Sequence, residues 1–264
     1  MAVRTRERLV IATLNTRGTP VRRSQLAGRY GAIGAAFEAS DVDIVNVQEV
    51  HSYYHLHLLK TAMPSYGEVN YRPSLLGPAG GLVTFVRGSV AARGYHRLPI
   101  GAGLEAPRWS RAAAPFKGML LTRLDRPGVW LANTHLLANY DGDWSDDSRF
   151  TPVHQGQLES LARMIQKLDD PIIMCGDFNV ARESSPFEAF CRRTGLVDAF
   201  AGHCPPTFHS EYLEAGKTAH CIDFMLLRGL EPTSAEQIFT DKVDLPGGPT
   251  YLSDHVGLRA IVVT

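Results

Sequence analysis

The sequence has few cysteines and no excess of charge of either sign. Its 264 residues include four cysteines and no CxxC pair, which argues against a disulfide-rich secreted scaffold. Lysine and arginine total 27, and aspartate and glutamate also total 27. A chain with balanced charge has no global field that would draw it to nucleic acid or to an anionic membrane.

Long apolar runs are missing as well. A membrane-spanning helix needs about 18 or more consecutive apolar residues, and no such run occurs, so no transmembrane segment is expected. The first stretch, MAVRTRERLVIATLNTRG, lacks the long apolar core of a signal peptide. Together with the sparse cysteines, these absences predict a cytoplasmic protein.

Short apolar runs, often rich in valine and isoleucine, are what the chain does contain. Such runs are typical of buried strands, and they occupy residues 9–14, 43–50, 81–86, 118–124, 129–136, 171–178, 221–227 and 256–263. Apolar residues spaced three and four apart predict an amphipathic helix over 155–170, and a weaker, glycine-containing helix is predicted over 23–40. Clustered strands with a few helices predict an α/β fold in which sheets pack face to face under outer helices.

Polar side chains stand at the ends of several of these apolar runs. They are Asn15, Glu49, His135, Asp177 and Asn179, with Asp223 near the start of its run and Asp254 and His255 just before the last one. Each alone is explained by a cap, a turn or a surface charge. Together they predict a site at one edge of a sheet, because strands hold side chains rigidly while the adjoining loops stay open to substrate.

The residue types indicate the chemistry of that site. Carboxylate and amide oxygens favour Mg²⁺, with Mn²⁺ as the alternative, over zinc. Glu49 is the leading candidate ligand, and Asn15 is expected beside it. Such a metal is suited to holding phosphate oxygens, and a carboxylate near His255 can tune a histidine for proton transfer. The pattern predicts cleavage of a phosphoester by water.

Six motifs, in order along nearly the whole chain, resemble the exonuclease–endonuclease–phosphatase superfamily of metal-dependent phosphoesterases. They are TLN at 13–15, QE at 48–49, NTHL at 133–136, GDFN at 176–179, IDF at 222–224 and SDH at 253–255. The resemblance implies a four-layer α/β sandwich of two mostly antiparallel β-sheets flanked by helices. It also implies that residues 1–264 form a single catalytic domain of this type.

The resemblance further implies how the metal and the water are handled. Glu49 and Asn15 are expected to hold Mg²⁺ against a non-bridging phosphate oxygen. His255, oriented by Asp254 or by Asp223, is expected to activate the attacking water.

Three other residues are expected to act on the phosphoryl group. Asp177 and Asn179 are expected to fix the water and the phosphoryl group in line, and His135 to donate to the developing charge. Both Asp177 and His255 stand as candidates for the general base.

The stretch NTHLLANYDGDW, a following helix with Gln157, and FKG at 116–118 resemble the neutral sphingomyelinase branch. On this basis Lys117, Asn139 and Phe208 are expected to contact the substrate. The predicted function is a magnesium-dependent phosphodiesterase acting on a lipid head group or a small diester. The loop around Arg108, Trp109 and Arg111 could hold phosphate or place an aromatic ring against a substrate or bilayer, or it could be an ordinary solvated loop.

Three alternatives remain open at this point. A DNA or RNA nuclease of the same fold is the runner-up, although nucleases usually benefit from a basic face that the balanced charge does not suggest. An inositol-phosphate phosphatase would need a dense basic pocket. A non-catalytic binding module would be expected to have lost a catalytic residue type, and none is missing. The sequence does not indicate the oligomeric state.

Overall fold

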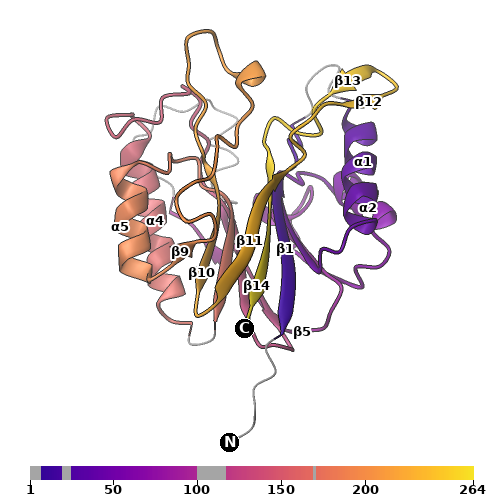
Figure 1. Cartoon of the computed structure of the whole chain (residues 1–264), viewed down its shortest axis with the longest axis horizontal. Helices are drawn as coiled ribbons and strands as arrows, with labels where there is room; N and C mark the ends of the chain where they lie inside the picture. Colours follow the sequence, from indigo (N-terminus) through magenta and orange to yellow (C-terminus); the bar gives the residue numbers. More distant parts are fainter. Residues whose placement is uncertain (1–6, 20–24, 100–116, 169–170) are drawn as a thin grey trace, which may run out of the picture.

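Two six-stranded sheets lie face to face, and helices cover the outer surface of each (Figure 1). The structure is a computed structural model that describes residues 7–19, 25–99, 117–168 and 171–264. Its layers are helices, sheet, sheet and helices. The predicted four-layer α/β sandwich is therefore confirmed.

The first sheet has the strand order β11-β14-β1-β2-β4-β3. Its strands are β11 (Glu231–Ile238), β14 (Gly257–Val263), β1 (Arg8–Asn15), β2 (Ile44–Gln48), β4 (Val83–Val86) and β3 (Glu68–Asn70). Only the pair β1 and β2 is parallel among these neighbours. Helices α1 (Leu26–Glu38) and α2 (Tyr53–Ala62) cover its outer face, on the right in Figure 1.

The second sheet has the strand order β5-β6-β7-β8-β10-β9. Its strands are β5 (Val90–Arg97), β6 (Gly118–Leu124), β7 (Trp130–His135), β8 (Ile172–Asp177), β10 (Asp223–Arg228) and β9 (Val197–Asp198). Only β7 and β8 run parallel to each other here. Helices α4 (Thr151–Ile165) and α5 (Ser185–Thr194) cover its outer face, on the left in Figure 1.

Four short elements complete the described part of the chain. The strands β12 (Val243–Leu245) and β13 (Gly248–Thr250) form a separate hairpin, and η1 (Ala79–Gly81) and η3 (Ser210–Tyr212) are single 3₁₀ turns. None of the described helices is both long and apolar enough to cross a membrane.

The apolar residues form two main cores. In one, the α1 residues Tyr30, Ile33 and Phe37 pack with the sheet residues Val45 and Phe85. The other, larger core contains buried residues of both sheets and of α4 and α5. The predicted α4 spacing is confirmed, because its apolar positions belong to this core. Removal of this apolar surface from water is the main term that stabilises the layered fold.

A buried polar contact joins the two sheets directly beneath one edge. Gln48 Nε2, at the end of β2, donates to Asn133 Oδ1 of β7 over 2.8 Å. Asn133 Nδ2 in turn donates to the carbonyl oxygens of Val47 and Val83, at 3.1 and 3.0 Å. Since buried polar groups are costly when unpaired, these bonds fix how β7 sits on β2.

The strand directions bring the predicted site residues to this same edge. The parallel pairing of β1 with β2 sets Asn15 opposite Gln48, the residue before Glu49. In the second sheet, His135 and Asp223 each lie opposite Asp177 in the register. Parallel strands end at the same side of a sheet, so both sheets contribute polar side chains to one place.

Candidate active site

The predicted residues converge on one cavity of about 320 Å³ between the ends of the two sheets. Its lining includes Glu49, His135, Asn139, Asp177, Asn179, Phe208, Asp254 and His255. Asn15 and Asp223 are buried immediately behind this lining, where they hydrogen-bond to its members. A concave site with convergent polar groups is the usual form of an active site.

Asn15 connects carboxylates that belong to different sheets. Its Nδ2 donates to Glu49 Oε1 over 3.2 Å and to Asp177 Oδ2 over 3.0 Å, while its Oδ1 accepts from the backbone N–H of Arg17 over 3.0 Å. An amide nitrogen is a donor and not a metal ligand. Ligation of a metal by Asn15 stays a prediction, and it would require the amide to turn its oxygen away from Arg17.

The Glu49 backbone is held in a narrow space. Its φ of 63° is left-handed, which is uncommon for a residue with a side chain. A Cβ on Gly18 would lie 1.7 Å from the Glu49 carbonyl oxygen, and one on Gly81 would lie 2.9 Å from the Glu49 Cα. Only glycine allows backbones to approach so closely. Two loops thus fix the direction in which the Glu49 carboxylate points.

Electrostatics keep Glu49 ionised. Burial alone would raise the pKa of Glu49, but the nearby His51 side chain opposes this most strongly, and the pKa is held well below its usual value. Among the described residues, the contacts of Glu49 Oε2 are long, 3.5 Å to Thr19 Oγ1 and 3.8 Å to His51 Nε2. The carboxylate therefore has acceptor capacity left over for a cation in the cavity.

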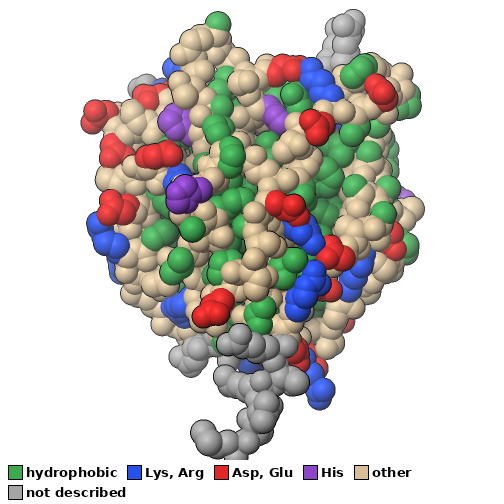
Figure 2. Space-filling view, in the orientation of Figure 1, with side chains coloured by type: hydrophobic (Ala, Val, Ile, Leu, Met, Phe, Trp, Pro, Cys, Tyr) green, Lys and Arg blue, Asp and Glu red, His purple; other side chains and the backbone are tan. Residues whose placement is uncertain are grey.

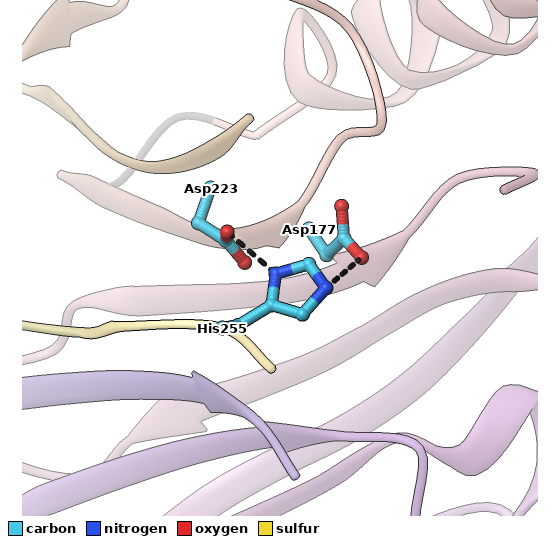
Figure 3. Close-up of side chains that lie close together, drawn as sticks. All are labelled: Asp177, Asp223 and His255. Carbon is cyan, nitrogen blue, oxygen red and sulfur yellow. Dashed lines mark hydrogen bonds and ion pairs between the residues drawn. The ribbon is translucent and has the colours of Figure 1, made fainter. Parts of the chain in front are cut away.

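His255 lies between two carboxylates, as Figure 3 shows. Its Nδ1 is 2.8 Å from Asp223 Oδ2, and its Nε2 is 3.7 Å from Asp177 Oδ2. Asp254 Oδ1 is 4.0 Å from Nε2, and its Oδ2 lies 3.4 Å from Arg17 Nε. Of the two carboxylates considered for orienting the ring, Asp223 is the one that forms the hydrogen bond.

These neighbours determine the charge of the imidazole. Burial alone would lower the pKa of His255, but Asp223 and Asp177 together raise it well above its ordinary value. Asp223 and Asp177 thus favour the protonated form of the ring.

The pKa of Asp177 is also raised, and several neighbours contact its carboxylate. Burial raises the pKa of Asp177 to about 7, with Asp223 adding to the effect and the charge of His255 opposing it. Its Oδ1 accepts from the backbone N–H of Asn179 over 3.0 Å, and its Oδ2 is 3.4 Å from His135 Nε2. A carboxyl group with a pKa near neutrality can exchange a proton during turnover.

His135 and Asn179 both contact Asp177 and line the cavity. Burial and the charge of Lys117 lower the pKa of His135 well below its ordinary value, so the ring is neutral, and its buried Nδ1 has no hydrogen-bond partner among the described residues. Asn179 has a φ of 52°, a conformation that asparagine tolerates, and its Oδ1 accepts from the backbone N–H of Asn139 over 3.3 Å.

The three residues expected to contact substrate are placed differently. The Phe208 ring lies edge-on to His255, with centroids 4.9 Å apart, and faces the cavity. Asn139 lines the cavity, but its Oδ1 accepts from the N–H of Asp141 over 3.2 Å, which folds the loop. Burial lowers the pKa of Lys117 to about 8, while the charges of Glu49 and Asp177 act against this, so Lys117 lies within their field.

The cavity has further walls that were not predicted. Tyr140, Trp144, Tyr212 and Lys217 also line it, and Tyr212 carries the Arg17 guanidinium 4.2 Å above its ring centre. A tryptophan inside the aspartate-rich run DGDWSDD was the available signal for Trp144. The residues Arg108, Trp109 and Arg111 lie outside the described part of the chain.

The donor set fits a hard divalent cation at Glu49. This carboxylate is ionised, faces the cavity and has free acceptor capacity, and a hard cation prefers such oxygen donors. Asp177, Asp223 and His255 also place donor atoms within 4.8 Å of one another. There, however, the 2.8 Å hydrogen bond already joins Asp223 to the ring, and a metal would have to displace it.

Comparison with known proteins agrees with this geometry. Residues 12–255 match the Endonuclease/Exonuclease/phosphatase family, and the chain belongs to that family. Members of this family are hydrolytic phosphoesterases, and the chain has their fold.

Solved structures of similar fold include TDP2 of D. rerio in complex with a single-strand DNA product, with a TM-score of 0.74 and 18% identity, covering 97% of this chain and 99% of that one. The structure of SmcL has a TM-score of 0.73 and 16% identity, and the match covers 97% of this chain and 99% of SmcL. Protein angel of Drosophila melanogaster is 34% identical over 89 residues, which span 33% of this chain and only 22% of that protein.

Proposed function

We propose that the protein is a divalent-metal-dependent phosphodiesterase that hydrolyses a single phosphodiester by in-line attack of water. The observation that carries the proposal is the convergence of Glu49, Asn15, Asp177 and the His255–Asp223 pair on one cavity. Mg²⁺ is the proposed ion and Mn²⁺ its alternative. When bound at Glu49, the ion would supply Lewis-acid stabilisation of a phosphate oxygen.

We assign the general base to Asp177. Its carboxyl group has a pKa of about 7, so part of the enzyme carries the ionised form at neutral pH. Asp223 and Asp177 favour the protonated form of His255, which cannot accept a proton from water but can donate through Nε2 to a phosphoryl oxygen. Asp223 acts by stabilising this imidazolium, in the way that carboxylates support catalytic histidines elsewhere.

The remaining residues position these groups. Asn15 holds Glu49 and Asp177 at a fixed separation, and the backbone N–H of Asn179 fixes the second oxygen of Asp177. Neutral His135 is assigned the role of a hydrogen-bond donor to the developing charge.

Cavity size and charge bear on the substrate. About 320 Å³ suits a head group or a small diester. Apart from the site residues, the cavity is lined by the carboxylates of Asp141 and Glu214 and by one lysine, Lys217. A substrate with several phosphates would need a cluster of cations, and the described lining lacks one. A single diester with a lipid or small organic substituent is the substrate class we favour.

Nucleic acid is the second candidate, because the aromatic side chains of Trp144, Phe208 and Tyr212 could stack on bases. The complex of TDP2 with a single-strand DNA product is in line with this candidate. On the face drawn in Figure 2, however, basic and acidic side chains are interspersed and no basic stripe is visible. Phosphate contacts dominate nucleic-acid affinity, so this surface favours the first candidate.

The test begins with a substrate that needs no particular recognition. Hydrolysis of bis(p-nitrophenyl) phosphate should require Mg²⁺ or Mn²⁺, stop with a chelator, and be lost in Glu49→Gln and His255→Ala. His203→Ala, an exposed histidine outside the cavity, should retain it.

³¹P NMR with sphingomyelin micelles, a single-stranded oligonucleotide and an inositol polyphosphate then identifies the substrate class. Phosphocholine from the micelles would support the lipid assignment. Product from the oligonucleotide alone would replace it with a nuclease. Activity that survives in Glu49→Gln would contradict the metal assignment.

A further inference from the structure

The exposed apolar side chains are gathered on one edge of the molecule. Among the described residues, the large hydrophobic side chains that are exposed are Tyr53, Tyr54, Leu75, Leu76, Tyr140 and Val197. Single exposed apolar residues are normal, but grouped ones mark contact surfaces. All except Val197 lie in loops or at a helix start on the edge that carries the candidate active site.

Two of these residues stand at the apex of a closed turn. Leu75 is 93% exposed and Leu76 is 76% exposed. The turn beneath them is closed because the backbone N–H of Ser74 and its Oγ both donate to the carbonyl oxygen of Gly77, over 3.0 and 2.7 Å. Pro73 and Pro78 face each other across its base. The two leucines are therefore presented to solvent by hydrogen-bonded backbone.

This turn is fastened to the start of α2 and, through it, to the active site. Tyr53 donates its hydroxyl to the carbonyl oxygen of Ser74 over 2.8 Å and its backbone N–H to that of Leu76 over 3.2 Å. A Cβ on Gly77 would lie 2.6 Å from the Ser52 Cα, so the turn presses against the segment that follows Glu49. Tyr53, Tyr54, Leu75 and Leu76 form one surface, which we name the apolar rim.

The two segments that carry the apolar rim contain cationic side chains and no carboxylates. Residues 50–62 and 71–78 contain no aspartate or glutamate, whereas they include Lys60 and the exposed Arg72. The wall on the other side of the cavity is different, because the stretch 141–147 alone holds four aspartates. A rim that joins leucines, tyrosines and cations without carboxylates is complementary to a surface of phosphates over hydrocarbon.

The geometry points to docking of the apolar rim on a lipid surface, with Leu75 and Leu76 inserted among the acyl chains and Tyr53 and Tyr54 at head-group level. This inference rests on the proposed function, since it explains how a lipid diester would reach the cavity. A convex apex suits a fluid bilayer, which closes around an inserted side chain, whereas a protein partner would need a matching groove. Tyrosine is typical of the membrane interface, where one end of its ring is apolar and the other wet.

Vesicle flotation tests the inference with the full chain and without metal. The wild type should float with phosphatidylcholine vesicles that contain phosphatidylserine. The double variant Leu75→Ser/Leu76→Ser should partition roughly 10- to 100-fold less, because two leucine side chains no longer leave water. Val197→Ser is the control, since it removes an exposed apolar side chain that lies away from the rim, and it should bind like the wild type.

A second readout reports insertion directly. In Leu76→Trp, the indole fluorescence should shift to the blue when these vesicles are added, beyond any shift of the wild type. Failure of the wild type to float, or equal flotation of wild type and double variant, would overturn the docking surface. Hydrolysis of bis(p-nitrophenyl) phosphate is measured in parallel and should be unchanged in the double variant. If the wild type itself does not hydrolyse this substrate, the proposed function is refuted. The flotation result alone then tests whether the apolar rim docks on lipid.

Discussion

Replacing Asp223 by asparagine should change the charge of His255 without changing the shape of the site. The 2.8 Å contact between Asp223 Oδ2 and His255 Nδ1 is a buried, charge-assisted hydrogen bond. Hydrogen bonds to charged groups contribute about 1.5–3 kcal/mol. Loss of this contribution should lower the pKa of His255. Asp177 remains and keeps part of the elevation.

The assay is an NMR titration of the His255 ring in metal-free protein, with wild type, Asp223→Asn and Asp254→Asn compared. Asp254 lies 4.0 Å from Nε2 and forms no hydrogen bond with the ring, so its variant should shift the pKa of His255 less. If the same energy is lost in the transition state, kcat for Asp223→Asn should fall roughly 10- to 100-fold. A larger shift in Asp254→Asn, or none in Asp223→Asn, would refute the assignment of Asp223 as the orienting partner.

Three further outcomes are expected. Asp177→Asn should lower kcat by roughly 10²–10⁴-fold and remove the rise of rate with pH that accompanies ionisation of this carboxyl group, as a pH–rate profile would show; a profile unchanged in shape would point away from Asp177 as the base. Glu49→Gln should weaken Mn²⁺ binding in calorimetry at least tenfold while the urea midpoint stays close to that of the wild type, and equal Mn²⁺ affinity would locate the ion elsewhere. Gln48→Leu should destabilise the fold by about 1–3 kcal/mol in urea unfolding, because Asn133 Oδ1 would lose its donor inside the core; stability equal to wild type would mean that the inter-sheet contact is not needed.

The apolar pattern predicted the central strands but not the marginal ones. β1, β2, β7 and β8 are mostly buried on both faces and contain largely apolar runs. β11, with the sequence EPTSAEQI, has no buried residue and is held mainly by its pairing with β14. Its backbone hydrogen bonds come from a partner that is adjacent only after folding, so sequence periodicity carried no signal for it.

The candidate site was predictable as a set of residues but not as a set of contacts. Asp254 is beside His255 in the chain but comes no closer than 4.0 Å to its Nε2, whereas Asp223 arrives from another strand and forms the hydrogen bond. The choice between these two carboxylates depended on how the sheets pack. The direction of the Asn15 amide likewise depends on Glu49 and Asp177, which come from different sheets.

Each of the two sheets supplies only part of the candidate active site. Glu49 and Asn15 belong to the first sheet and its loops, while Asp177, His135 and Asp223 belong to the second. The 3.0 Å bond from Asn15 to Asp177 exists only while the sheets are docked. Hydrolysis can thus report on that docking, because any separation of the sheets would pull the two parts of the site apart.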